Sequence, residues 1–149
     1  EYSDIDLHKV LNRIYNLLET DINKKGILLE YKIESKASYI RADVEMLEQV
    51  IINLIFNAID AVLHVNNPQI SFHIQSESTN SIMILVEDNG CGIKQKELEQ
   101  IFIPFYTTKK KGSGIGLSLV RQIVHLHKGN IQIESEVGVG TKVFLRLPK

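Results

Sequence analysis

Apolar residues recur with helical spacing in three parts of the chain. Positions 7, 10, 11, 14, 17 and 18 predict a first helix, capped at Ser3 or Asp4 and ended by Gly26. A second helix is expected to begin at the N-cap Asp43 and to close near residues 66–68. Apolar positions 117, 119, 120, 123, 124 and 126 predict a third, and residues 94–100 a short fourth.

Strand-like segments lie between these helices. Residues 27–33 and 39–41 are predicted to be extended, and positions 70, 72 and 74 alternate as in a strand, with a turn at 76–80. The apolar run 82–86 predicts a buried strand ending at Asp88, and positions 131, 133, 143, 145 and 147 predict two more. Helices packed on one face of a mixed, largely antiparallel sheet would make an α+β fold.

A polar stripe interrupts the second helix. Asn53, Asn57 and Asp60 fall within roughly 60° of arc, whereas aliphatic residues occupy positions 47, 50, 51, 54, 55, 58 and 62 on the flank and back. An amide oxygen suits a hard cation such as Mg²⁺ that arrives bound to phosphates. The alternative is an amphipathic helix whose polar face simply meets solvent.

The strand that ends at Asp88 runs into a glycine-containing turn. Gly90 and Gly92 alternate after the carboxylate, which lets backbone and acceptor approach a flat ligand closely. Asp88 can accept a hydrogen bond from an exocyclic amine, and Ile93 supplies an apolar wall. An ordinary tight turn is the competing interpretation, since Asp, Asn and Gly are common turn residues.

Three more glycines precede the third predicted helix. Gly112, Gly114 and Gly116 alternate strictly, so the segment matches neither a dinucleotide-binding fingerprint nor a P-loop. A glycine-rich loop that opens a helix presents free N–H groups and the positive end of the helix dipole, which together bind phosphate. A flexible linker is the alternative.

The order and spacing of these motifs resemble the ATP-binding catalytic domain of two-component sensor histidine kinases. That domain belongs to a superfamily shared with DNA gyrase, the mismatch-repair ATPase and the heat-shock chaperone ATPase. Residues 53–60 match its asparagine box, 88–92 and 112–116 its two glycine boxes, and 101–105 its phenylalanine box, while 138–141 also fit. The resemblance implies one domain over residues 1–149, a two-layer α/β sandwich of the Bergerat type with about three main helices on one face.

The resemblance also implies ATP and Mg²⁺ as cofactors and assigns roles to residues. Asn57 matches the metal ligand, Asn53 lies one turn earlier near metal and phosphates, and Asp88 matches the carboxylate that recognises the adenine amino group. The catalytic residues are expected to be Asn53, Asn57 and Lys109. The expected ATP-contacting residues are Asn53, Asn57, Asp60, Asp88, Gly90, Gly92, Ile93, Phe105, Thr108, Gly112, Ser113, Gly114, Ile115, Gly116, Leu117 and Thr141.

Residues 106–111 form a short polar segment of the type that acts as an ATP lid. The lysines of this segment can reach the γ-phosphate as point charges or belong to a solvated loop. Lys110 and Lys111 fit the solvated loop better, whereas both interpretations stay open for Lys109 because its position matches the family pattern. Phe102 and Phe105 are expected to seat the lid, although aromatic residues at this spacing also occur as core.

The expected reaction is phosphoryl transfer from ATP to a histidine nitrogen. In the ATPase branches of the superfamily a glutamate that activates water stands where this chain has Asn53, and an amide cannot act as that base. None of the five histidines lies in a phosphoacceptor motif, so the acceptor is expected on a separate dimerisation and phosphoacceptor helical domain, with a response-regulator receiver domain downstream. A serine kinase or ATPase of the same fold, and a non-catalytic nucleotide-binding regulatory module, are the alternatives.

Composition narrows the class of protein. The chain has 149 residues, 44% of them hydrophobic, which is enough for one core. A net charge of −1 gives no indication of nucleic-acid or membrane affinity, so neither partner is expected for this domain. The single cysteine, Cys91, excludes an internal disulfide and is interpreted as an inert small residue. The domain is expected to be cytoplasmic, whether or not its parent protein is anchored in a membrane.

Overall fold

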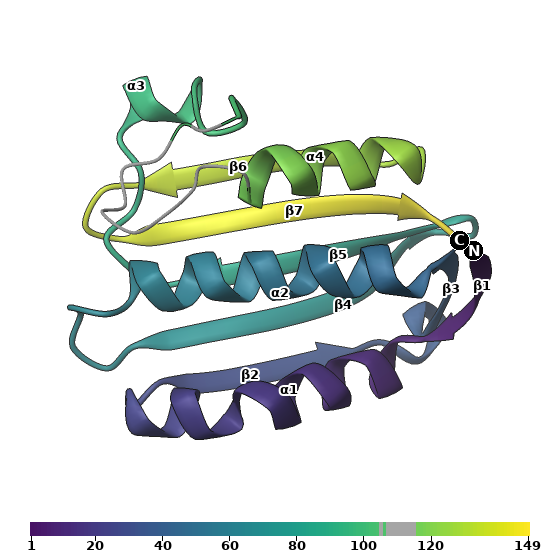
Figure 1. Cartoon of the computed structure of the whole chain (residues 1–149), viewed down its shortest axis with the longest axis horizontal. Helices are drawn as coiled ribbons and strands as arrows, with labels where there is room; N and C mark the ends of the chain where they lie inside the picture. The colour runs from purple at the N-terminus through teal and green to yellow at the C-terminus, as the bar shows by residue number, and fades with distance from the viewer. Residues whose placement is uncertain (105, 107–115) are drawn as a thin grey trace.

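The computed structural model describes residues 1–104, 106 and 116–149 and has two layers (Figure 1). The helices are α1 Leu7–Lys24, α2 Val44–Ala61, α3 Gln95–Leu98 and α4 Gly116–Leu126, with a 3₁₀ turn at Ser35–Ala37. The strands are β1 Tyr2–Asp6, β2 Leu28–Ile33, β3 Tyr39–Asp43, β4 Gln69–Ser78, β5 Ser81–Asp88, β6 Asn130–Glu136 and β7 Gly140–Pro148.

One five-stranded sheet carries α1, α2 and α4 on a single face (Figure 1). The strand order is β2-β4-β5-β7-β6; β2 pairs with β4 in parallel, and the other pairs are antiparallel. Strands β1 and β3 form a separate antiparallel pair. The α+β class and the mixed, mostly antiparallel sheet are therefore confirmed.

The core lies between the sheet and the three long helices. In β5, Ile82, Ile84 and Val86 are buried at alternate positions, as expected for a strand with one covered face. The predicted back of the second helix is buried, because the seven aliphatic positions predicted for it all pack inward, six of them in α2 and the last at its C-cap: Leu47, Val50, Ile51, Leu54, Ile55, Ala58 and Val62. The helical period thus fixes which side of α2 is left for polar residues.

The predicted start of the first helix is wrong. The residues before the first helix form β1, and the N-cap is Asp6, whose side chain accepts a hydrogen bond from the His8 N–H at 2.9 Å. Ser3 and Asp4, the predicted caps, lie within β1 instead and pair with Ala42 and Arg41 of β3. A strand whose partner lies about 40 residues away has no local signature.

The second helix ends earlier than predicted. It stops at Ala61 because the carbonyl of Ala61 accepts a hydrogen bond from the Cys91 N–H, at 2.9 Å, across the fold. The following N–H groups of Leu63 and Val65 bond three residues back instead, as in a tightening turn. Asp43, by contrast, is the N-cap as predicted, and its carboxylate accepts from the Met46 N–H.

The predicted turn between β4 and β5 is also too long. Strand β4 continues to Ser78, where the Ser78 and Ser81 hydroxyls lie 2.7 Å apart, with an irregular register between Ser76 and Ser78. The polar residues 76–80 predicted a turn, but Ser76 and Ser78 belong to β4 and pair with Ile82 and Ser81 of β5.

The far end of α4 is anchored by a histidine. His127 is 7% exposed, its Nδ1 lies 2.8 Å from the Ile123 carbonyl, and its Nε2 accepts from the Asp43 N–H at 3.2 Å. The ring also stacks on Tyr2, with centroids 4.9 Å apart. His127 thus joins α4 to the start of α2, with both ring nitrogens in hydrogen-bonding contacts. Among the described residues, none of the helices has the length and apolar character needed to cross a membrane.

Candidate functional site

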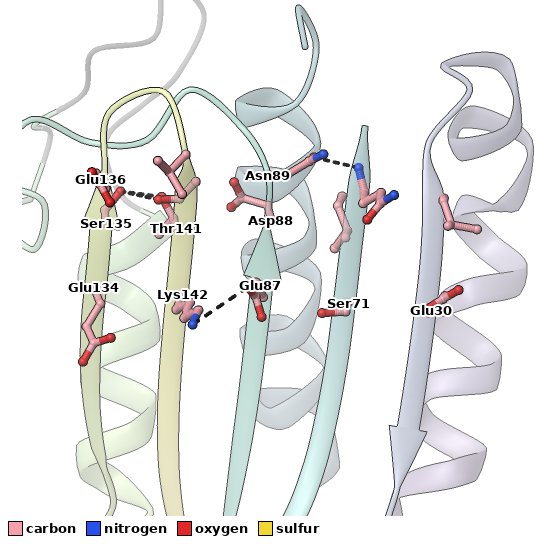
Figure 2. A pocket seen from close by; sticks show the side chains of 15 residues that line it. Glu30, Ser71, Glu87, Asp88, Asn89, Glu134, Ser135, Glu136, Thr141 and Lys142 are labelled. Carbon is pink, nitrogen blue, oxygen red and sulfur yellow. Dashed lines mark hydrogen bonds and ion pairs between the residues drawn. The ribbon is translucent and has the colours of Figure 1, made fainter. Parts of the chain in front are cut away.

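A row of polar residues crosses the helix-facing side of the sheet where β5 ends. Asp88 pairs with Ile70 of β4 on one side and Thr141 of β7 on the other, and Thr141 pairs with Ser135 of β6. These residues continue the alternation of the buried strand positions, so they face the same side as the core. Figure 2 shows Ser135, Thr141 and Asp88 next to one another at this edge.

Asp88 is half-buried, and this changes the pKa of its carboxyl group. Burial raises the pKa of the Asp88 carboxyl above its ordinary value of 3.8, because the carboxylate loses solvation. The N–H groups of Gly90 and Thr141 lower that pKa by stabilising the carboxylate, and neighbouring Glu87 adds to the rise. Asp88 therefore presents a partly desolvated acceptor, one oxygen of which takes the Gly90 N–H at 2.8 Å.

The turn after Asp88 lies directly against the end of α2. A Cβ at Gly90 would lie 2.4 Å from the Ala61 carbonyl oxygen, so only glycine allows this approach. The hydrogen bond from the Cys91 N–H to Ala61 fixes it. Cys91 itself is exposed, with its backbone groups bonded. Gly90 is therefore required by the contact with a helix end, and the predicted approach of this turn to a flat ligand stays a prediction.

The same turn is held from the other side by the β6–β7 connection. Gly92 has φ +75°, and a Cβ there would lie 2.2 Å from the Glu136 carbonyl oxygen. The Gly138 N–H donates to the Cys91 carbonyl at 2.9 Å, and the Ile93 N–H donates to Ser135 Oγ at 2.8 Å. Residues 88–93 are therefore fixed between α2 and β6–β7.

Asn89 is a residue of this turn that the sequence analysis left out. Its side chain accepts from the Gln69 N–H at 2.8 Å and donates to the Asn67 carbonyl at 2.9 Å. The Asn89 N–H also bonds to the Gln69 carbonyl. These contacts tie the α2–β4 connection to the turn. The signal that could have identified it is its place between Asp88 and Gly90, in a turn-forming sequence.

The polar stripe of α2 faces the start of α4. Asn53 and Asn57 are half-buried and Asp60 is exposed. Asn53 donates from Nδ2 to the Gln49 carbonyl at 2.8 Å, and its Oδ1 would lie 3.1 Å from a Cβ placed on Gly116. Asn53 of the stripe and Gly116, the first residue of α4, are therefore neighbours.

Several predicted site residues lie outside the described part of the chain: Phe105, Thr108, Lys109, Gly112, Ser113, Gly114 and Ile115. Of the residues on either side, Leu117 is half-buried in the first turn of α4, and Phe102 is half-buried beneath the Arg121 guanidinium, 5.4 Å from the ring centroid. That cation–π contact joins the phenylalanine box to α4.

A hollow of about 610 Å³ opens at the same edge of the sheet (Figure 2). Of the predicted site residues, Asp88 and Thr141 line it, whereas Asn53 and Asn57 do not. Most of its wall comes from outward-facing positions such as Glu87, Lys142 and Glu134, whose side chains point away from the helices. The hollow thus begins at the Asp88 row but continues over the open face of the sheet, and we place the candidate site on the helix-facing side.

The described side chains limit how a divalent metal ion could be held. Among residues 1–104, 106 and 116–149, no three His, Cys, Asp or Glu side chains converge in a way that would hold an ion alone. Asn57 offers one amide oxygen on the stripe beside α4. Because Mg²⁺ is commonly held by one or two protein oxygens together with substrate phosphates, these residues fit that ion.

Comparisons with known proteins find a matching family model and similar relatives. The family described as "Histidine kinase-, DNA gyrase B-, and HSP90-like ATPase" matches residues 42–149. The sensor histidine kinase ZraS of Escherichia coli K12 is 37% identical over 144 residues, which cover 97% of this chain and 30% of that protein.

Two structures of the histidine kinase ThkA are also similar. Its nucleotide-free catalytic domain superposes with a TM-score of 0.88 at 31% identity, covering 100% of this chain and 98% of that one. ThkA in complex with the response regulator protein TrrA gives a TM-score of 0.83 at 28% identity, covering 99% of this chain and 42% of that one.

Proposed function

Because this chain belongs to the histidine kinase-, DNA gyrase B- and HSP90-like ATPase family, we propose that it binds ATP with Mg²⁺ and donates the γ-phosphoryl group to a histidine on a separate domain. That domain would be the dimerisation and phosphoacceptor helical domain of the same parent protein.

The observation that supports this proposal best is the meeting of three separate sequence motifs at one end of the fold. The turn after Asp88 is bonded to the end of α2 through Ala61, and Asn53 on α2 lies beside Gly116 at the start of α4. A partly desolvated acceptor, the amide of Asn53 and the start of α4 therefore lie at the same end of the fold. They match the base, the metal-bound phosphates and the phosphate oxygens of a nucleotide, respectively.

The residues would act mainly by positioning and by charge stabilisation, which is what phosphoryl transfer needs. Asp88 would accept from the exocyclic amine of adenine, beside Thr141. Asn57 would ligate Mg²⁺, which neutralises charge on the phosphates when bound, and the first-turn amides of α4 would hold phosphate oxygens. A neutral imidazole is already a nucleophile, so no base is required to activate it.

Asn53 favours transfer over hydrolysis in this scheme. Its side-chain amide donates to the Gln49 carbonyl and directs its oxygen toward Gly116. An amide cannot remove a proton from water, so we expect hydrolysis of ATP to be slow. The serine-kinase and ATPase alternatives need such a base.

The acceptor and the signalling partner would lie in other parts of the parent protein or in other proteins. The chain spans less than a third of the length of ZraS. ThkA is known in complex with the response regulator TrrA. We extend this to a receiver domain as the downstream partner of the present protein.

The test is a labelling experiment with γ-phosphate-labelled ATP, in which the chain is mixed with the helical phosphoacceptor segment of its parent. We expect an acid-labile, base-stable label on that segment, as phosphohistidine gives, and none when its histidine is replaced by alanine. A base-labile ester would support the serine kinase instead. If ATP binds and no label forms, the chain is a regulatory module and the transfer proposal is wrong.

A further inference from the structure

The Ser135 hydroxyl makes three hydrogen-bonding contacts, one of them with Thr141, which lies beside the candidate base-binding carboxylate of Asp88. The Ile93 N–H donates to Ser135 Oγ at 2.8 Å, the Gly140 carbonyl oxygen lies 3.1 Å from Ser135 Oγ, and Thr141 Oγ1 lies 2.7 Å from it. Thr141 is 8% exposed and is the direct partner of Asp88 in the β5–β7 register. Ser135 therefore contacts three groups in one place.

The chemistry of these groups fixes the direction of each hydrogen bond. A serine hydroxyl has one hydrogen and two lone pairs. The Ile93 N–H can only donate and the Gly140 carbonyl can only accept, so Ser135 uses one lone pair for the first and its hydrogen for the second. Its second lone pair then takes the Thr141 hydroxyl hydrogen. Only this assignment satisfies all three contacts at once.

Thr141 is consequently left as an acceptor. Its single hydroxyl hydrogen is directed to Ser135, so Thr141 Oγ1 offers only lone pairs to any ligand, and Asp88 beside it also accepts. Directly paired residues on one face of a sheet have Cβ atoms roughly 4.5–5.5 Å apart, close enough for both to meet one ligand group. Two neighbouring acceptors match an exocyclic amino group and repel a carbonyl oxygen.

We propose that Ser135 is a positioning residue that determines base specificity: it holds Thr141 as a hydrogen-bond acceptor beside Asp88, and so makes the site prefer a 6-amino purine to a 6-oxo purine. This inference rests on the proposed function, because it requires a purine base at Asp88.

The test compares binding of ATP and inosine triphosphate, which differ at purine position 6, by calorimetric titration in Mg²⁺. The wild type should prefer ATP. In Ser135→Ala the Thr141 hydroxyl is released and can donate to a 6-oxo group. The ratio of the Kd for inosine triphosphate to the Kd for ATP should therefore fall about 3- to 10-fold, the range expected for one hydrogen bond. Ser135→Thr retains a hydroxyl and should keep most of the preference.

Ser78→Ala is the matched control. The Ser78 and Ser81 hydroxyls are also 2.7 Å apart, but they are exposed and lie at the opposite end of β4 and β5, so this variant should keep the wild-type ratio. Thr141→Val removes the acceptor by a second route, without changing Ser135, and should lower the ratio in the same direction even if Ser135→Ala does not fold.

Two results would overturn the inference in distinguishable ways. An unchanged ratio in both Ser135→Ala and Thr141→Val, with ATP still bound, would make Ser135 a structural residue only and leave the proposed function in place. Failure of the wild type to bind ATP would instead remove the proposed function and this inference together.

Discussion

The Cys91 N–H donates a hydrogen bond to the Ala61 carbonyl, 2.9 Å away, and so joins the turn after β5 to the last residue of α2. This bond ends the helix and fixes the height of the Asp88 turn above the sheet. The bond uses backbone atoms, so it does not depend on the side chain at position 91, and the side chains of Asn89 and Ser135 add further hydrogen bonds that hold the turn.

The close approach of Gly90 to α2 leads to a stability prediction. Gly90→Ala would place a Cβ 2.4 Å from the Ala61 carbonyl oxygen and 2.5 Å from the Ala61 carbonyl carbon. Because both of these atoms belong to the backbone of α2, the turn must move. We expect the free energy of unfolding in urea to fall by about 1–3 kcal/mol, the usual effect of overpacking.

Gly26→Ala is the control for this variant. Gly26 has φ +65° but nothing within 4 Å of an added Cβ, so only backbone strain is introduced, about 1 kcal/mol. Equal destabilisation by the two variants would show that the contact with Ala61 is not the limiting one.

The raised pKa of Asp88 predicts a pH-dependent effect on stability. A carboxyl whose pKa is higher in the folded state binds its proton more tightly there, so its contribution favours folding below the unfolded pKa and is lost as pH rises through the folded pKa. At neutral pH the charged Asp88 thus destabilises the fold.

Asp88→Asn keeps an acceptor for the Gly90 N–H and removes the charge. We therefore expect its Tm to exceed that of the wild type by a few degrees at pH 7, with the difference shrinking as pH falls toward 3.8. Thermal scans across this range measure it. A Tm difference that is the same at every pH would contradict a raised pKa for this group.

The hydrogen bonds of His127, just after the end of α4, lead to a second stability prediction. In His127→Phe the ring can still stack on Tyr2, but the partly buried N–H of Asp43 loses its acceptor. The free energy of unfolding should fall by about 1–3 kcal/mol, because a partly buried donor is left without its acceptor. His125→Phe, at an exposed position of the same helix, should change it by less than about 0.5 kcal/mol. If the two variants behave alike, the hydrogen bonds of His127 do not stabilise the fold.

The helices and central strands followed from the sequence because their burial is periodic. The seven aliphatic positions predicted for the second helix and the alternation in β5 are local patterns, and the residues that they mark as inward-facing are buried in the structure. Strand β1 was missed because Ser3, Asp4 and Asp6 have no strand-like pattern of their own; their extended form depends on pairing with β3. The early end of α2 was missed for a similar reason, since its cause lies in a turn 30 residues away.

The site was predictable at the level of motifs and less so at the level of contacts. Asp88, Gly90 and Gly92 were identified from their spacing, and the structure brings them against α2 and β6–β7. Ser135 and Asn89 were missed, because nothing in a sequence shows which backbone groups a side chain will meet. The alternation from Ile131 through Ile133 does place Ser135 on the same face, a signal that could have been used.

Titration of ATP with and without Mg²⁺, with the wild type, Asp88→Asn and Asn57→Ala side by side, tests the central claim most directly. We expect Asp88→Asn to lose its preference for ATP over inosine triphosphate but to keep the gain in affinity from Mg²⁺. Asn57→Ala should keep the base preference and lose most of that gain. If both variants bind both nucleotides as the wild type does, with the same dependence on Mg²⁺, this end of the fold is not the nucleotide site.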